Sequence, residues 1–107
     1  EFRRVLFRSM TRSRVYPSLP TVSESGMAGY DVTTWYGVLA PAGLPPPILN
    51  KLHADLTRVA RLPDVEERFA SEGGDIVASK PEAFGTFIAL ELAKWAKVAK
   101  AASIKVE

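Results

Sequence analysis

The pattern of apolar and polar positions is irregular in the first part of the chain and regular in the second. From Leu44 onward, apolar side chains recur every three or four positions, as on a helix with one buried face. We predict three helices there: from the prolines after Leu44 to about Ala60, from Pro63 to about Glu72, and from Ser79 to about Ala101. Prolines lie at the start of each, where the N–H groups have no helical partner to lose.

Two short sequences have the form of a capping box, in which a hydroxyl and an acidic side chain three positions later satisfy each other's backbone N–H groups. Thr21 with Glu24 is the first, and it predicts a short helix at about residues 22–25. Ser79 with Glu82 is the second, and it supports the start of the longest helix.

Two segments are predicted to be strands. Tyr30 to Ala40 is rich in β-branched and aromatic residues, and Gly37 within it indicates a bulge or a close backbone approach. Asp75 to Val77 is a brief second strand after Gly73-Gly74, which end the preceding helix. The predicted fold class is therefore α/β, mostly helical, with one long strand and one short strand.

A carboxylate falls within the apolar face of the longest helix. The apolar side chains of that face are Phe84, Phe87, Ile88, Trp95, Val98, Ala99 and Ala102. Glu91 lies in the middle of them, and an unpaired charge in apolar contact costs several kcal/mol. We expect Glu91 to have a hydrogen bond or a Lys or Arg partner, and we interpret it as structural rather than ligand-binding.

The net charge of +2 comes from the first nine residues, EFRRVLFRS. They match the translation of the end of a common sequencing adapter, and we interpret residues 1–9 as an artefact ahead of a natural sequence that begins near Met10. Without their three arginines and one glutamate, eleven basic and eleven acidic residues remain. This neutral balance disfavours a nucleic-acid-binding module.

No motif for enzyme chemistry is present, and we expect neither a catalytic activity nor a cofactor. Cysteine is absent and His53 is the only histidine, so a zinc site built from thiolates or several histidines is excluded. His53 lies beside the polar face of its predicted helix, and we expect it to be exposed. The sequence contains no run of 18 apolar residues, so it predicts no membrane span.

Thr33-Thr34-Trp35-Tyr36 is the most site-like segment. Hydroxyl and backbone N–H groups can hold a carboxylate, and an aromatic ring can form the wall of a pocket. In a strand, Thr34 and Tyr36 would face one side and Trp35 the other, so only part of the segment could line a cleft. Ordinary packing in a sheet is the alternative interpretation.

Short motifs follow one another in a specific order. They are Pro20-Thr21-Val22-Ser23-Glu24-Ser25-Gly26, Gly29-Tyr30, Trp35-Tyr36-Gly37, Ala40-Pro41-Ala42-Gly43, Leu62-Pro63-Asp64, Gly73-Gly74, Pro81-Glu82-Ala83-Phe84, and Glu91 with Trp95. In this order, from about Ser13 to Glu107, the chain resembles the last third of Bug/TctC-type solute-binding proteins. One departure is Leu44, where the family usually has threonine before the proline.

The resemblance implies a fragment of a two-lobed periplasmic-binding-protein fold of type II. Residues 10–31 would end the second lobe, and residues 32–107 would form the hinge strand and the helices that return to the first lobe. The family members are periplasmic receptors that pass small carboxylates to the membrane subunits of a tripartite tricarboxylate transporter. On this basis Thr34, Trp35 and Tyr36 would lie near the cleft, and we predict them as ligand-binding residues.

A small self-contained α/β domain, whose helical faces dock on a protein partner, is the alternative function. If the chain is a fragment, apolar faces meant for two lobes are uncovered. We therefore expect residues 10–107 alone to be aggregation-prone or molten, without a cooperative thermal transition.

Overall fold

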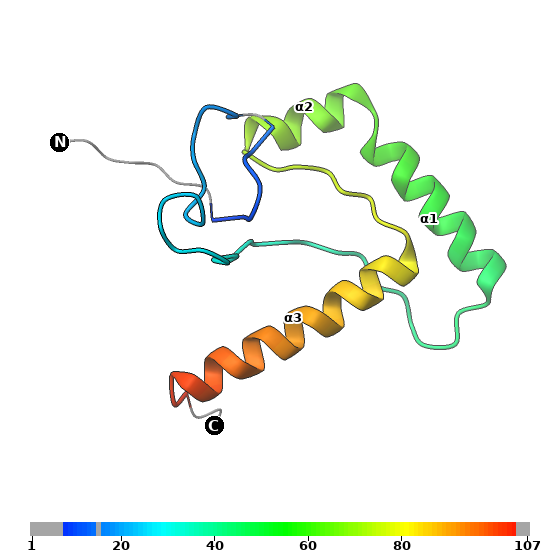
Figure 1. Ribbon diagram of the computed structural model, residues 1–107. Coiled ribbons are helices and arrows are strands. Elements are labelled where there is room, and N and C mark those ends of the chain that lie inside the picture. The colour runs from blue at the N-terminus through cyan, green and yellow to red at the C-terminus, as the bar shows by residue number, and fades with distance from the viewer. Residues whose placement is uncertain (1–7, 15, 105–107) are drawn as a thin grey trace. The chain divides into compact units, whose positions relative to one another are not determined.

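The computed structural model describes residues 8–14 and 16–104. In these residues it contains three helices, α1 (Pro46–Ala60), α2 (Pro63–Ser71) and α3 (Pro81–Ala101), which Figure 1 shows. The chain divides into two compact units, Glu1–Ile76 with α1 and α2, and Val77–Glu107 with α3. The three predicted helices are thus confirmed. The proposed artefact at the N-terminus lies outside the described residues except for its last two positions.

The helix α1 begins at a run of prolines. Pro45 is its N-cap, and the Pro45 carbonyl accepts the N–H groups of Ile48 and Leu49 at 3.0 and 3.1 Å. Pro46 and Pro47 occupy the first turn, where a missing N–H removes no helical hydrogen bond. Local sequence therefore suffices to start this helix, and α1 then contacts α2 within the same unit.

A Schellman motif ends α2. The N–H of Gly73 donates to the carbonyl of Ala70 at 2.9 Å, and the N–H of Gly74 donates to the carbonyl of Phe69 at 2.8 Å. Gly73 has a φ of +77°, which is in the left-handed region that glycine adopts without a steric penalty. The predicted end of this helix at the two glycines is confirmed.

The capping box predicted at Ser79 is wrong. Lys80 is the N-cap of α3, with φ −64° and ψ 152°, and no side chain caps this end. A cap at Ser79 would make Lys80 the first helical residue, but the residue before a proline avoids the helical conformation. Because Pro81 follows, α3 begins one residue later than that box requires.

The two predicted strands are not formed in the described part of the chain. Tyr30 to Ala40 runs without a turn or bend, and Asp75 to Val77 is also irregular (Figure 1). A strand requires a neighbour with which its backbone groups exchange hydrogen bonds. Residues 36–40 make no such bond with any described residue, so the bulge expected at Gly37 is absent too.

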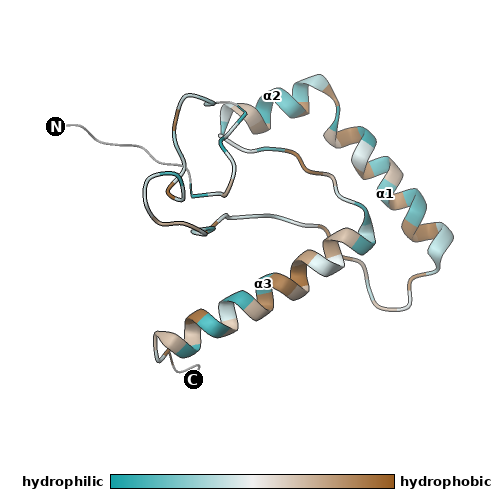
Figure 2. Ribbon diagram, in the orientation of Figure 1, coloured by the Kyte–Doolittle hydropathy of each residue, from teal (hydrophilic) through white to brown (hydrophobic). Residues whose placement is uncertain are grey.

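No apolar side chain is buried among the described residues, where only Ser13 and Thr21 are buried. The apolar stripe of α1 remains 45 to 49% exposed at Ile48, Leu52, Leu56 and Val59. Figure 2 shows apolar and polar positions alternating along α1 and α2 and a dense apolar stretch in α3. Since burial of apolar surface is the main stabilising term in folding, the helices depend largely on local interactions. This exposure supports the expected marginal stability, which stays a prediction.

Candidate functional site

The predicted ligand-binding residues lie on the unbent segment between Tyr30 and Ala40. The Thr34 side chain is exposed, Trp35 is 40% exposed, and Tyr36 is 91% exposed. These three residues do not line the hollow described below. Their role in binding stays a prediction.

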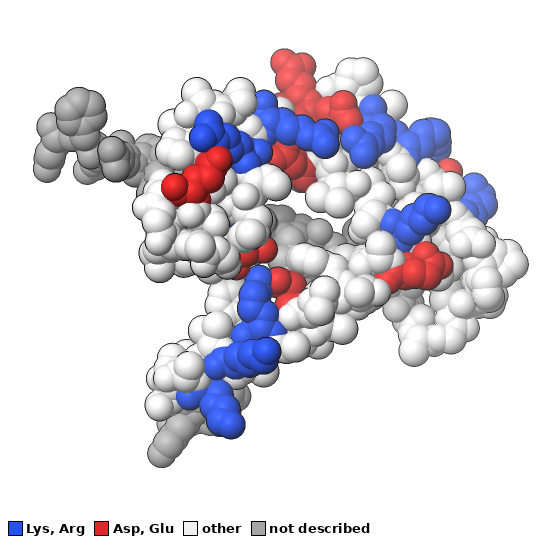
Figure 3. All heavy atoms as spheres, viewed as in Figure 1, with Lys and Arg blue, Asp and Glu red and all other residues white. Residues whose placement is uncertain are grey.

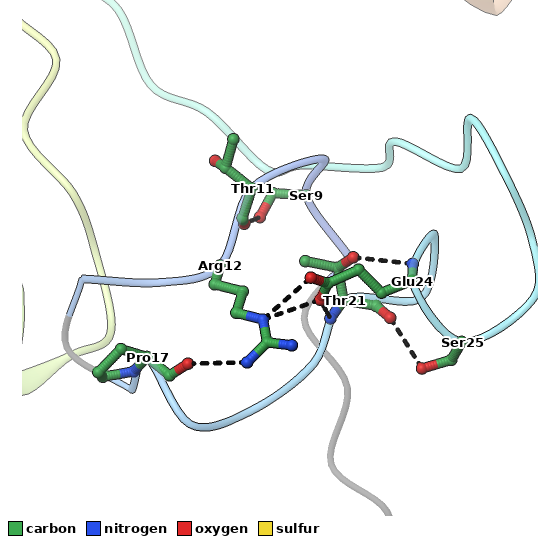
Figure 4. A network of polar contacts seen from close by, with 7 residues as sticks. All are labelled: Ser9, Thr11, Arg12, Pro17, Thr21, Glu24 and Ser25. Atoms are coloured by element: carbon green, nitrogen blue, oxygen red, sulfur yellow. Dashed lines mark hydrogen bonds and ion pairs between the residues drawn. The ribbon is translucent and has the colours of Figure 1, made fainter.

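The Thr21 turn, residues 21–27, contains the capping box predicted from the sequence. Thr21 Oγ1 accepts the N–H of Glu24 at 3.1 Å, and Glu24 Oε2 accepts the N–H of Thr21 at 2.8 Å (Figure 4). The N–H of Ser25 reaches the Thr21 carbonyl at 3.2 Å, and Gly26, with φ +116°, changes the chain direction. The cap is confirmed, but the short helix predicted here is a single hydrogen-bonded turn.

Arg12 joins the Thr21 turn to the connector before it. Its Nε donates to Glu24 Oε1 and Oε2 at 3.1 and 2.9 Å, and its Nη1 donates to the Pro17 carbonyl at 3.2 Å (Figure 4). The hydrogen bond from the Thr21 N–H, followed by the Arg12 guanidinium, holds the pKa of Glu24 below its usual value. The Glu24 carboxylate is thus occupied by protein donors, which makes this network structural rather than a ligand site.

An open hollow of about 160 Å³ lies within the first unit. Its walls are Arg14, Arg61, Glu66, Ala70, Gly74, Asp75 and Ile76. Arg61 Nη1 lies 3.3 Å from Glu66 Oε1, and about half of each side chain is exposed. The lining includes two arginines and two acidic residues, so their formal charges cancel and would not select an anion. Sequence reasoning did not find it, because its walls come from segments that share no motif.

The polar face of α1 carries a small group of exposed charges. Asp55 lies 2.9 Å from Lys51 Nζ and 3.4 Å from Arg58 Nη2. The hydrogen bonds from Lys51 and, to a lesser extent, from Arg58 lower the pKa of Asp55. The hydrogen bond between Lys51 and Asp55 also raises the pKa of Lys51. Figure 3 shows such basic and acidic side chains side by side on the molecule. His53 on this helix is half-buried, so the expectation that it is exposed is wrong.

Glu91 in α3 has the partners that the sequence predicted. Its Oε2 accepts the indole N–H of Trp95 at 3.0 Å, and its Oε1 pairs with Lys94 Nζ. The Lys94 ammonium also lies 5.5 Å from the centre of the Trp95 ring. The Glu91 side chain is 12% exposed, and its partners come from the next turn of the same helix.

Neither a metal cluster nor a spanning helix occurs in the part of the chain that the structure describes. No group of three or more His, Asp or Glu side chains there could hold a metal ion. Even α3, with 21 residues, is too polar to cross a membrane.

Comparisons with known proteins identify relatives over nearly the whole chain. Residues 1–104 match the tripartite tricarboxylate transporter family receptor. The chain is 31% identical over 99 residues to protein BugT of Bordetella pertussis, a match covering 92% of this chain and 30% of BugT. It is 37% identical over 90 residues to a UPF0065 protein of Agrobacterium vitis, covering 81% of this chain and 26% of that protein.

The three-dimensional structure is similar to that of the periplasmic binding protein BugD. The TM-score is 0.76 at 31% identity, and the match covers 94% of this chain and 34% of BugD. This similarity supports the predicted periplasmic-binding-protein fold. The chain thus spans about a third or less of the length of these relatives. By the match over residues 1–104, this chain belongs to the tripartite tricarboxylate transporter receptor family, the Bug/TctC proteins that its sequence motifs indicate.

Proposed function

We propose that the chain is the C-terminal third of a periplasmic receptor that captures a small carboxylate for the membrane subunits of a tripartite tricarboxylate transporter. The observation that carries the proposal is the similarity to BugD, in which 94% of this chain matches 34% of a periplasmic binding protein. Such a receptor binds and releases its ligand unchanged. The proposal therefore assigns no catalytic residue.

The exposed apolar faces support a place within a larger fold. Ile48, Leu52, Leu56 and Val59 form one stripe on α1, and each is nearly half exposed. Folded domains normally bury most side chains of this kind. In the proposed receptor, residues 10–31 end the second lobe, residues 32–107 pass through the hinge to the first lobe, and the remainder of the receptor covers these faces.

The proposed carboxylate contacts are Thr34, Trp35 and Tyr36. The hydroxyl groups of Thr34 and Tyr36 make no hydrogen bond within the described part of the chain, and both side chains are exposed. They are therefore able to donate to a carboxylate, and such charge-assisted hydrogen bonds are stronger than neutral ones. The exposed part of the Trp35 ring would form an apolar wall beside them.

The test uses the full-length receptor from the source gene. Thermal-shift screening against tricarboxylates, dicarboxylates, aromatic acids and amino acids would identify a ligand, and calorimetry would then compare variants. We expect Trp35→Ala to weaken binding at least about tenfold, because a buried aromatic contact is lost. Tyr36→Phe should weaken it about fivefold, because one hydrogen bond is lost. Tyr30→Phe, the same substitution in the same segment, is the control and should bind like the wild type.

Two outcomes separate the site from the function. Unchanged affinity in both Trp35→Ala and Tyr36→Phe would remove these residues from the proposed site and leave the receptor in place. A full-length receptor that binds none of the carboxylates would contradict the function itself. A natural gene start near Met10, with no receptor sequence upstream, would instead support the self-contained interaction domain that the amphipathic α1 also permits.

A further inference from the structure

The chain leaves the Thr21 turn through a second turn, residues 27–30, which we call the exit turn. The Tyr30 N–H donates to the Met27 carbonyl at 3.0 Å, which closes a β-turn. Gly29, the third residue of the exit turn, has a φ of +79°, as a type II turn requires at that position. The unbent segment that carries the proposed ligand contacts begins where the exit turn ends.

The Ser23 side chain holds the exit turn to the Thr21 turn. Ser23 Oγ accepts the N–H of Gly29 at 3.1 Å. Farther along, the Arg8 carbonyl accepts the N–H of Val32 at 2.8 Å, but any residue at position 8 can supply that carbonyl. The Ser23 contact depends on a side chain, so a substitution can remove it.

The Thr21 turn is a firm base for the Ser23 contact. Thr21 is completely buried, and Thr21 and Glu24 satisfy each other's backbone N–H groups. Arg12 joins Glu24 to the connector before the turn. Ser23 therefore attaches the exit turn to a part of the chain that is already held in place.

A small rotation at the exit turn would displace the proposed ligand contacts by a large distance. Trp35 lies six residues after Gly29, which is roughly 20 Å along an extended chain. A change of about 10° in direction at Gly29 would therefore move Trp35 by roughly 3 Å. Binding groups must be held within about 0.5 Å of the geometry that the ligand needs. Control of the exit turn is thus control of the proposed site.

We infer that Ser23 is a positioning residue, whose hydroxyl sets the direction in which Thr34, Trp35 and Tyr36 extend from the Thr21 turn. The inference rests on the proposed function. Ser23 does not touch the ligand and acts only through Gly29 and the segment that follows it.

Replacing Ser23 in the full-length receptor tests the inference. Calorimetry would use whichever of citrate, succinate, benzoate and glutamate the wild-type receptor binds. We expect Ser23→Ala to raise the dissociation constant about fivefold, the effect of losing one hydrogen bond. Ser23→Thr keeps the hydroxyl and should stay within about twofold of the wild type.

A double variant shows whether Ser23 acts through the site. Ser23→Ala combined with Tyr36→Phe should raise the dissociation constant by less than the product of the two separate effects, because both substitutions weaken the same ligand contact. Effects that multiply fully would mean that Ser23 acts elsewhere, and would overturn the inference.

Ser25→Ala is the matched control. Ser25 Oγ donates to the Thr21 carbonyl at 2.9 Å (Figure 4), so this variant removes one hydroxyl bond from the same turn but leaves the exit turn attached. The dissociation constant of Ser25→Ala should change less than about twofold. Equal weakening by Ser23→Ala and Ser25→Ala would overturn the inference, because a general loss of stability in the Thr21 turn would then explain both.

Amide hydrogen exchange of the ligand-free receptor gives a readout that does not depend on binding. Exchange of the Gly29 amide should accelerate about fivefold in Ser23→Ala and change little in Ser25→Ala. A receptor that binds its carboxylate equally well with and without Ser23→Ala would overturn the positioning role and leave the proposed function in place. A wild-type receptor that binds none of the four carboxylates would contradict the function, and with it the contacts that Ser23 positions.

Discussion

The Thr21 turn and residues 36–40, which we call the unpaired segment, belong to the same unit. They differ in how their polar backbone groups are satisfied. In the Thr21 turn, Thr21 is completely buried, and Glu24 three residues later supplies the matching donor and acceptor. In residues 36–40, no backbone N–H or C=O group is hydrogen-bonded to any residue that the structure describes. The contrast shows that a partner three residues away completes the Thr21 turn, whereas residues 36–40 have no such partner in their own neighbourhood of the sequence.

Of the changes considered, removing the Thr21 hydroxyl should have the largest effect on amide exchange in the Thr21 turn. Thr21→Val keeps the shape of the side chain but leaves the Glu24 N–H without its acceptor, at a cost of about 1–2 kcal/mol. Exchange of the Glu24 amide should then accelerate about 5- to 30-fold toward the rates of the unpaired segment. Thr34 is exposed, and its hydroxyl bonds to no residue that the structure describes, so Thr34→Val should change exchange less than about twofold. Equal effects of the two variants would contradict the role of the cap.

Replacing glycine by alanine at two positions provides a second test, because the two substitutions should change helix stability in opposite directions. Gly73→Ala should destabilise the end of α2 by about 1 kcal/mol, because a side chain at φ +77° is strained even where the surrounding space is open. Gly85→Ala, also in open space but inside α3, should stabilise its helix by about 1 kcal/mol. Helix content measured by circular dichroism would check both signs. A gain of helix with Gly73→Ala would show that the left-handed cap is not required.

Acidification should break the Thr21 turn before it affects the unpaired segment. The pKa of Glu24 is lowered, so its contribution to stability is fully present above its usual, unfolded value. That contribution is lost as the pH falls through the lower folded value. Amide exchange and side-chain chemical shifts recorded between about pH 5 and 2 would follow this loss.

Arg12→Gln separates the two causes of the Glu24 shift. The pKa should rise only part of the way to its usual value, because the Thr21 N–H, the larger cause, remains. A complete return to the usual value would assign the whole shift to Arg12.

The exposed charges of α1 should have the smallest effect. Asp55→Asn removes the contacts to Lys51 and Arg58, but all three side chains are well exposed to solvent. Exposed pairs contribute little because water and salt screen them, so amide exchange in α1 should change at most about threefold. The change should shrink as the salt concentration rises. A larger change in amide exchange that did not depend on salt would contradict this expectation. It would mean that the exposed ion pairs of Asp55 stabilise the chain as much as the Thr21 cap does.

The helices were predictable because their signals are local. Pro46 and Pro63 mark helix starts, and Gly73 marks a helix end, through the properties of one or two residues. The capping box at Thr21 was predictable for the same reason. The box at Ser79 failed because the preference of the residue before Pro81 was not weighed against the hydroxyl pattern.

The strands and the tertiary contacts were less predictable. The β-rich composition of Tyr30 to Ala40 describes how that segment would pair, but pairing depends on residues distant in sequence. The ion pair of Arg12 with Glu24 joins residues twelve positions apart without a motif, and the hollow beside Arg14 joins more distant segments still. The predicted contacts at Thr34, Trp35 and Tyr36 depend on the family resemblance and need the ligand experiment.

The unbent conformation of the unpaired segment also has a consequence for proteolysis. Proteases cut preferentially where the chain is exposed and weakly held. Residues 36–40 meet both conditions, and Tyr36 and Leu39 are side chains that a chymotrypsin-like enzyme accepts. A first cut after either residue would separate the Thr21 turn from all three helices. Residues 36–40 are therefore the place where the chain should be divided first.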